Sequence, residues 1–200
     1  PNPGEELNPG DETPARLAAS AIVLRDGDDG VDVLLVQRNP DASFMGGAWV
    51  FPGGSVHDSD DGERGAALRE LEEEAALAVR DPDELVAFSR WVTPAEVKKR
   101  FDTWFFVMRA PQGQEPKVDD AECVDFRWIS PRGALEAGER GELLLVFPTI
   151  KHLEQLAELE SVDHALEVAR GRTVEPVQPR VIVKDDHAQV LLPGEPGYED

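Results

Sequence analysis

The fold of this chain is decided by one stretch of sequence, Phe51-Pro-Gly-Gly-Ser-Val-His-Asp-Ser-Asp-Asp-Gly-Glu-Arg-Gly-Ala-Ala-Leu-Arg-Glu-Leu-Glu-Glu-Glu-Ala-Ala-Leu77. Glycines open it, and an amphipathic helix is expected from about Glu63 to Leu77. At about 100° per residue, Glu70, Glu73 and Glu74 share one helix face, and the opposite face is apolar. No lysine follows within the next two turns to relieve their repulsion. Because Mg²⁺ prefers carboxylate oxygens, the pattern predicts a metal site; the alternative is an exposed acidic helix.

These residues resemble the Nudix box, the motif of hydrolases that cleave nucleoside diphosphates linked to another moiety. The family pattern is G-x5-E-x7-R-E-U-x-E-E-x-G-U, where U is aliphatic. Residues 69–74 match its R-E-U-x-E-E core at every defined position, and Pro52-Gly53-Gly54 supplies the glycine turn. Three features depart from the pattern: the loop from Gly54 to Arg69 is one residue longer, Asp61 stands at the first glutamate, and Ala76 replaces the last glycine.

The resemblance implies an α/β fold, namely a Nudix α/β/α sandwich with a mixed β-sheet, to which a C-terminal helix and hairpin are added. It also implies that Mg²⁺ or Mn²⁺ ions are held by the Gly53 carbonyl and by the carboxylates of Glu70, Glu73 and Glu74. Arg69 would orient Glu70 through a charge-assisted hydrogen bond. Both Arg69 and Glu70 are therefore expected to act in catalysis.

A further carboxylate is expected from the acidic loop that precedes the strand Val124 to Ile129. Family members draw an added metal ligand or a base from this region, and Glu122 is the first candidate, with Asp120 second. An ordinary acidic turn is the alternative. Either Glu70 or Glu122 could deprotonate the attacking water, and the sequence does not choose between them. The single Cys123 is expected to be a buried thiol.

Two segments resemble one subgroup of the family, the coenzyme A and acyl-coenzyme A diphosphatases. The subgroup motif L-L-T-x-R-[SA]-x3-R-x3-G-x3-F-P-G-G is matched at Leu34, Leu35, Arg38, Gly47 and Phe51 to Gly54, and it is not matched at Val36, Asn39 and Ser43. A second segment, Trp91 to Phe106, resembles W-x-T-P…R-F-D-T-x-F-F in relatives of the nineteenth-type human Nudix enzyme.

The subgroup resemblance implies that Arg38, Phe44 and Gly54 contact the substrate. The alternatives are that Arg38 caps a strand end and that Phe44 packs beneath its loop. The first hypothesis is hydrolysis of coenzyme A or acyl-coenzyme A to 3′,5′-ADP and a 4′-phosphopantetheine product. The second keeps the chemistry and takes NADH or ADP-ribose, and the third is a Nudix-fold binding protein without turnover.

Length and composition limit the remaining possibilities. The chain of 200 residues suits a flexible leader over 1–14, a Nudix domain over 15–170 and a hairpin or tail extension over 171–200. A formal charge of −21 argues against nucleic acid as a partner and leaves a small nucleotide substrate. No apolar run approaches the ~20 residues of a membrane span, so a soluble, cytoplasmic protein is expected. Exchange of the hairpin with a second subunit leaves a homodimer open.

The coarse pattern predicts strands joined by polar turns, with two helices. Strands are expected at 17–24, 31–37, 50–51, 85–93, 100–109 and 124–129, and a hairpin at 177–183 and 188–192. The acidic helix should begin at a cap supplied by Asp58, Ser59 or Asp61. A helical turn is expected within 131–141 and one helix from Phe147 to about Arg170, which carries His152 as a core or surface residue.

Overall fold

A mixed β-sheet forms the centre of the molecule. The computed structural model describes residues 13–184 and 187–199. Along the main path the strand order is β8 (Leu144–Leu145), β3 (Ala48–Val50), β2 (Gly30–Arg38), β1 (Arg16–Gly27), β6 (Phe101–Arg109), β5 (Val86–Val92) and β9 (Pro176–Val177). Two further strands leave this path, since β4 (Gly53–Ser55) pairs with β1 and β7 (Cys123–Ile129) pairs with β2. The pair β1 and β6 is parallel, whereas β2 is antiparallel to β1, so the sheet is mixed as expected.

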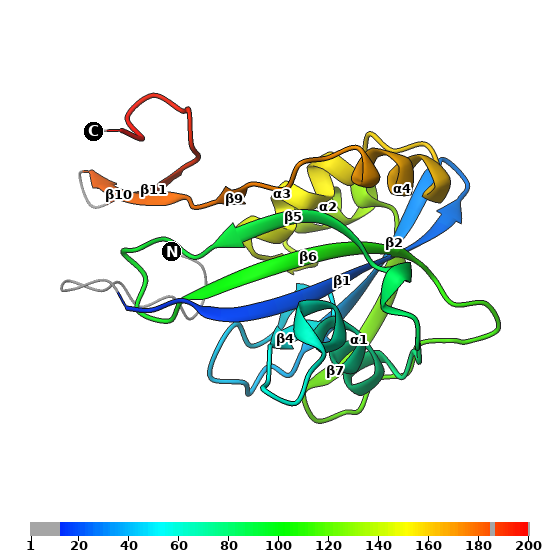
Figure 1. The fold of residues 1–200 in the computed structure, drawn as a ribbon. Helices are drawn as coiled ribbons and strands as arrows, with labels where there is room; N and C mark the ends of the chain where they lie inside the picture. The colour runs from blue at the N-terminus through cyan, green and yellow to red at the C-terminus, as the bar shows by residue number, and fades with distance from the viewer. Residues whose placement is uncertain (1–12, 185–186, 200) are drawn as a thin grey trace.

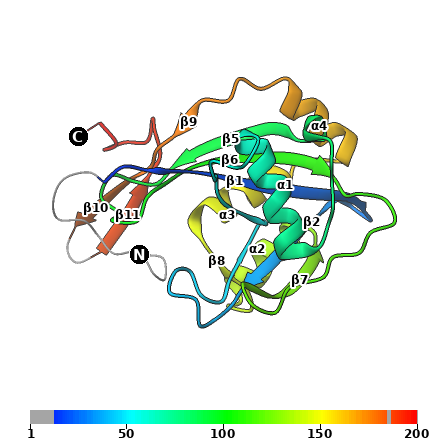
Figure 2. The same cartoon turned by 60° about the horizontal axis from the view of Figure 1, so that its bottom comes forward.

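Helices cover both faces of this sheet. Helix α1 (Gly62–Ala75) lies on one face, and α2 (Pro131–Glu139), α3 (Phe147–Leu156) and α4 (Val162–Arg170) lie on the other (Figure 1). Figure 2 brings α1 forward and shows it lying across β1 and β6. The α/β/α sandwich predicted from the sequence is therefore confirmed.

Strand β1 joins the two hydrophobic cores because its side chains alternate between the faces of the sheet. Ile22 and Leu24 pack in the core beneath the three later helices, whereas Ala21 and Val23 pack in the core beneath α1. All four side chains are fully buried. Burial on both faces explains why this strand reads as a nearly continuous apolar run.

Two predictions for the helices are wrong. The expected single helix from 147 to about 170 is two helices, α3 and α4, because a 3₁₀-type turn follows Leu156 and Ser161 then caps α4. The Ser161 hydroxyl accepts a hydrogen bond from the His164 amide at 3.1 Å. At the start of α1, Asp61 occupies the cap position, but its side chain accepts no capping hydrogen bond. The helical turn expected within 131–141 is the nine-residue helix α2.

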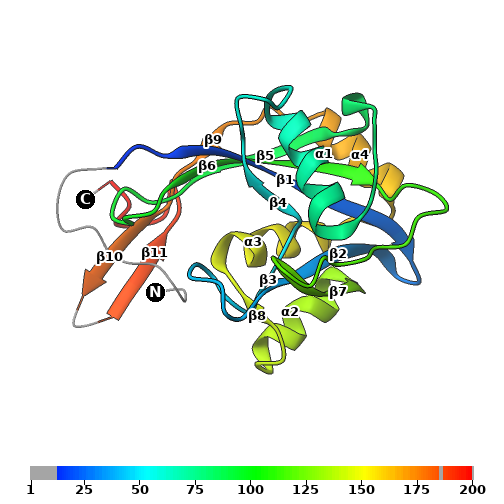
Figure 3. The same cartoon turned by 90° about the horizontal axis from the view of Figure 1, so that it is seen from below.

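The C-terminal region carries the predicted hairpin. Strands β10 (Arg180–Lys184) and β11 (His187–Leu191) form a separate two-stranded sheet, which Figures 1 and 3 show beyond one end of the main sheet. Before it, β9 runs parallel to β5 and so ties this region to the main sheet. The expected turn at 185–186 and most of the expected leader, residues 1–12, lie outside the described residues. No helix that the structure describes is long and apolar enough to cross a membrane.

Candidate functional site

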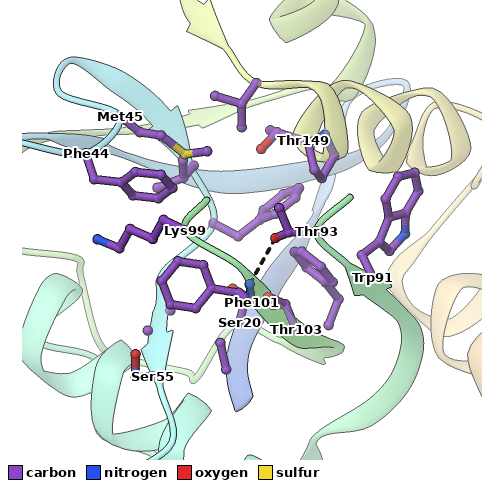
Figure 4. A pocket seen from close by; sticks show the side chains of 18 of the residues that line it. Ser20, Phe44, Met45, Ser55, Trp91, Thr93, Lys99, Phe101, Thr103 and Thr149 are labelled. Carbon is purple, nitrogen blue, oxygen red and sulfur yellow. Dashed lines mark hydrogen bonds between the residues drawn. The ribbon is translucent and has the colours of Figure 1, made fainter. Parts of the chain in front are cut away.

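A cavity of about 490 Å³ lies where the glycine strand and the acidic helix meet the ends of the central strands. Residues of β1, β4 and α1 line it, together with the loop after β2 and the ends of β5 and β6. The start of α3 and the C-terminal hairpin complete the lining. Figure 4 shows side chains converging on it from these separate segments. Elements far apart in the chain thus build one recess.

Two glutamates of α1 face this cavity from buried positions. Glu70 is 7% exposed and Glu74 is 2% exposed. Burial raises the pKa of both carboxyls, for Glu74 to about 7, because it penalises the charged form; neighbouring carboxylates add to this effect. The Gly53 amide opposes it by donating a hydrogen bond to Glu74 Oε2 at 2.9 Å. Two buried carboxylates, whose charged forms are disfavoured by burial, therefore lie side by side at the cavity wall.

Strand β4 approaches these carboxylates so closely that it requires glycine. A Cβ atom on Gly54 would stand 2.3 Å from Glu70 Oε1, and one on Gly53 would stand 2.2 Å from the hydroxyl oxygen of Ser20. A side chain at Gly53 would also meet the backbone of β1, with the Ala19 carbonyl oxygen at 2.5 Å, and would push β4 away from β1, whereas one at Gly54 would displace the Glu70 carboxylate. The glycines predicted from the motif thus lie at the cavity with the helix carboxylates.

Arg69 holds these acidic groups in place. Its Nη1 donates to Glu70 Oε1 at 2.8 Å and to Glu73 Oε2 at 3.0 Å, and its Nη2 donates to the Ser55 carbonyl at 2.9 Å. Its Nε and Nη2 also bind the two oxygens of Asp60 at 2.8 and 3.0 Å. The guanidinium therefore connects β4, the loop and the helix.

Asp60 is the loop partner of Arg69, whereas Asp61, which stands at the first glutamate of the family pattern, is exposed. The Asp60 side chain is 5% exposed. The hydrogen bonds from Arg69 lower the pKa of this carboxyl to about 2. The sequence offered a partial signal, because the extra loop residue makes the pattern fall on Asp60 when it is counted forward from Gly54 and on Asp61 when it is counted back from Arg69.

Glu73 lies at the same wall but turns outward. Its side chain is 59% exposed and is held by Arg69. Within the part of the chain that the structure describes, no group of three or more His, Cys, Asp or Glu side chains is arranged to hold a metal ion. Glu70 and Glu74 nevertheless fit a hard divalent cation, since they are buried carboxylates that face the cavity and such cations prefer carboxylate oxygens.

Glu122 lies at the cavity, as predicted, whereas Asp120 does not line it. The negative charge of Glu122 contributes to the raised pKa of Glu70, which places the two carboxylates near each other. The loop is held by the Asp119 carboxylate, which accepts hydrogen bonds from the amides of residues 121, 122 and 123. Of the two loop candidates, only Glu122 joins the site.

The predicted substrate contacts Arg38 and Phe44 also line the cavity. Arg38 Nε donates to the Phe44 carbonyl at 3.3 Å, and its charge lowers the pKa of Glu74. Two residues that sequence reasoning did not single out lie beside Phe44. They are Phe101, with ring centroids 5.9 Å apart, and Lys99, whose Nζ is 4.3 Å from the Phe44 centroid. Phe101 belongs to the R-F-D-T match of the Trp91 to Phe106 segment, but no spacing rule places it or Lys99 beside Phe44, because both lie more than 50 residues away along the chain.

Two buried groups lie outside this set. Cys123 is fully buried, and burial raises the pKa of its thiol, as expected for an inert cysteine. His152 is also fully buried, behind the cavity; its Nδ1 donates to the Pro148 carbonyl at 2.6 Å, and its Nε2 then accepts from the Ser89 hydroxyl at 2.5 Å. His152 is thus a satisfied core residue, one of the two alternatives for it.

Comparisons with known proteins all match this chain to one family. The model of the NUDIX domain family matches residues 14–146. Putative nudix hydrolase 7 of Caenorhabditis elegans is 26% identical over 210 residues, covering 84% of this chain and 70% of the relative. The human acyl-coenzyme A diphosphatase NUDT19 is 32% identical over 118 residues, which is 56% of this chain but only 31% of that protein.

Solved structures agree with this result. A NUDIX hydrolase from Alicyclobacillus acidocaldarius superposes with a TM-score of 0.69 at 28% identity, covering 78% of this chain and 96% of the other. The NUDIX domain of Shewanella oneidensis NrtR, solved with ADP ribose, superposes with a TM-score of 0.56 over 73% of this chain and 88% of the other. At 20% identity, the second likeness concerns the fold alone.

Proposed function

Since this chain belongs to the Nudix hydrolase family, whose members act on pyrophosphate bonds of nucleoside diphosphate derivatives, we propose that it cleaves coenzyme A or acyl-coenzyme A. The products are 3′,5′-ADP and 4′-phosphopantetheine or its acyl derivative. The observation that carries the chemistry is the buried pair Glu70 and Glu74 at the wall of a nucleotide-sized cavity, beside a strand that only glycine permits.

Divalent cations, Mg²⁺ or Mn²⁺, fit this wall. Glu70, Glu73, Glu74 and the Gly53 carbonyl would hold them, and Glu73 would exchange its contact with Arg69 for the metal. When bound, such ions neutralise the pyrophosphate and make water more acidic. Without them, four carboxylates of the site, counting Glu122, would repel an anionic substrate.

The residues of the chain itself supply orientation and a proton acceptor. Asp60 and the Ser55 carbonyl hold Arg69, and Arg69 in turn holds Glu70 Oε1, which leaves Oε2 available to the cavity. The free Oε2 of Glu70 favours this residue as the base, since Glu74 Oε2 already accepts a hydrogen bond from the Gly53 amide. Glu122 remains the second candidate for this role because it lines the same cavity.

Support for a coenzyme A substrate comes from the sequence match to the human acyl-coenzyme A diphosphatase. The Trp91 to Phe106 segment, which carries the subgroup resemblance, supplies a large part of the cavity wall. Apolar residues also line the cavity, a suitable surface for a pantetheine or acyl chain: Val146, Phe147, Pro179, Val181 and Val190.

The second candidate substrates are NADH and ADP-ribose. The tilted pair of aromatic rings at Phe44 and Phe101 favours them, since a nucleotide base could pack on either ring. ADP ribose is also the ligand of the Shewanella domain. A binding protein without turnover is the third candidate, and the complete set of carboxylates in the box argues against it.

The test is phosphate-bond cleavage with Mg²⁺ and with Mn²⁺ on coenzyme A, an acyl-coenzyme A, NADH, ADP-ribose and dGTP. We expect selective release of 3′,5′-ADP from the coenzyme A compounds. Preference for NADH or ADP-ribose would keep the chemistry and reject the substrate. No cleavage of any compound would favour the binding protein.

The metal assignment is tested with Glu73→Gln, for which we expect activity to fall by roughly a hundredfold or more, with weaker Mn²⁺ binding by calorimetry. Glu72→Gln is the matched control, since Glu72 sits on the same helix and pairs with Arg80 away from the cavity. Full activity of Glu73→Gln at saturating Mg²⁺ would refute the assignment.

A further inference from the structure

The cavity is lined by three Lys and Arg side chains of the described residues, and two of them are engaged with the acidic wall. Arg69 binds Asp60, Glu70 and Glu73. Arg38 donates to a backbone carbonyl, and its charge acts on Glu74. The third is Lys99, and within residues 13–184 and 187–199 no carboxylate forms an ion pair with its ammonium group.

Two aromatic rings hold Lys99 in place. Its Nζ lies 4.3 Å from the ring centroid of Phe44 and 5.7 Å from that of Phe101. Figure 4 shows the lysine side chain extending between the two rings. Contact with a ring face stabilises a cation by ~0.5–1 kcal/mol at an exposed site and restricts where the flexible side chain can point.

The loop that carries Lys99 is braced at its base. The Thr93 amide donates to the Phe101 carbonyl at 2.8 Å. The Phe101 amide donates to the Thr93 hydroxyl at 3.0 Å, which is the bond drawn in Figure 4. These two bonds close the loop between β5 and β6 and fix where it meets the cavity. A cation is therefore presented at a defined position on an element separate from the carboxylate helix.

We propose that Lys99, together with Phe44 and Phe101, forms a subsite for a phosphate monoester that the substrate carries outside the cleaved pyrophosphate. This proposal rests on the function proposed above, since it concerns the same cavity. A pyrophosphate undergoing cleavage must lie against the box carboxylates on α1, whereas Lys99 belongs to the β5–β6 loop. In a protein of net charge −21, an ammonium group that has no acidic partner among the described residues, at the wall of a nucleotide cavity, attracts a second anionic group.

The chemistry recognised is a phosphate monoester on the ribose of a nucleotide. Such a group occurs at the 3′ position, as in coenzyme A, and at the 2′ position, as in phosphorylated nicotinamide dinucleotides. The test uses three simple probes that need no turnover, namely 5′-AMP, 3′,5′-ADP and 2′,5′-ADP. Their binding to the full chain in the presence of Mg²⁺ is measured by calorimetry.

We expect the unmodified chain to bind one bisphosphate about 5- to 10-fold more tightly than 5′-AMP, as for a charged hydrogen bond at a partly exposed site. Preference for 3′,5′-ADP indicates a coenzyme A type of substrate, and preference for 2′,5′-ADP indicates the dinucleotide type. Lys99→Gln should abolish the preference, and Lys99→Arg should retain most of it. Lys98→Gln is the matched control, because Lys98 neighbours Lys99, is exposed and does not line the cavity.

Two results would overturn the proposal: equal affinity of all three probes for the unmodified chain, or a preference that survives in Lys99→Gln. If Lys99 only clamped Phe44 against Phe101, Lys99→Gln would weaken all three probes equally and leave their ratios unchanged. Failure of the proposed function is a separate result, seen as lack of cleavage of coenzyme A by a chain that keeps the binding preference.

Discussion

Replacing Asp60 tests which aspartate holds Arg69. Asp61 stands at the first glutamate of the family pattern, whereas the structure pairs Arg69 with both oxygens of Asp60. Asp60→Asn keeps the size of the side chain and removes the charge that anchors the guanidinium. Asp61→Asn is the matched control, because Asp61 is exposed and its side chain makes no capping hydrogen bond.

The magnitude follows from the pKa of Asp60. Its value falls from 3.8 to about 2, and each pKa unit corresponds to ~1.4 kcal/mol, so the ion pair contributes roughly 2 kcal/mol at neutral pH. Because the folded-state pKa is depressed, this contribution is present above about pH 4 and is lost as pH falls towards 2. For a chain of this length, the loss corresponds to a fall in Tm of roughly 4 to 8 °C.

The assay is urea unfolding of both variants at pH 7, followed by measurement at decreasing pH down to 3. Asp60→Asn should lose roughly 2 kcal/mol and, with Arg69 less well held, about tenfold or more in kcat. Asp61→Asn should change the unfolding free energy by less than ~0.5 kcal/mol. A larger loss in Asp61→Asn than in Asp60→Asn would refute the assignment of Asp60.

Three further predictions concern stability and reactivity. Ala76 ends α1 with φ 55°, which glycine adopts more easily, so Ala76→Gly should stabilise the fold by about 1 kcal/mol in urea unfolding. Ala157→Gly, at a cap with φ −63°, should instead destabilise the fold by about 0.5 to 1 kcal/mol. A change in unfolding free energy of the same sign in both variants would contradict this reasoning. Burial lowers the pKa of His152 from 6.5 to about 4, so its contribution to stability is present above about pH 6.5 and is lost as pH falls towards 4. The difference in unfolding free energy between the unmodified chain and His152→Leu should therefore shrink by about 3 kcal/mol over that range. A constant difference would show that His152 does not titrate there. The thiol of Cys123, whose pKa burial raises, should react with a thiol reagent only after unfolding, so rapid labelling of the native chain would contradict its burial.

The acidic helix and the glycines before it were predictable because their information is local, although Gly53 and Gly54 lie in the short strand β4 and not in a turn. Helical periodicity places Glu70, Glu73 and Glu74 on one face wherever the helix packs, and glycines just before it mark a close approach of two elements. The strands β1, β2, β6 and β7 were also predicted, since apolar runs between polar turns record burial in a sheet.

The break between α3 and α4 was missed for a related reason. The apolar period runs on through this region, so the pattern favours one helix. Ser161 ends it by capping a new helix, and a serine at a cap looks the same in sequence as a serine on a solvated face. Local pattern therefore identified helical sequence there but not where one helix stops.

By itself, the sequence determined the family, the sandwich of helices on a mixed sheet, and the helix with its arginine and glutamates. Only the tertiary structure decided that Asp60 is the partner of Arg69, that Glu122 and not Asp120 reaches the cavity, and that Lys99 lies between Phe44 and Phe101. The physical reason is that only spacing along one helix or strand is set by backbone geometry. A contact made by a loop depends on the path of that loop, as for Asp60 and Arg69, and on how the whole sheet and its helices pack, as for Phe44 and Lys99.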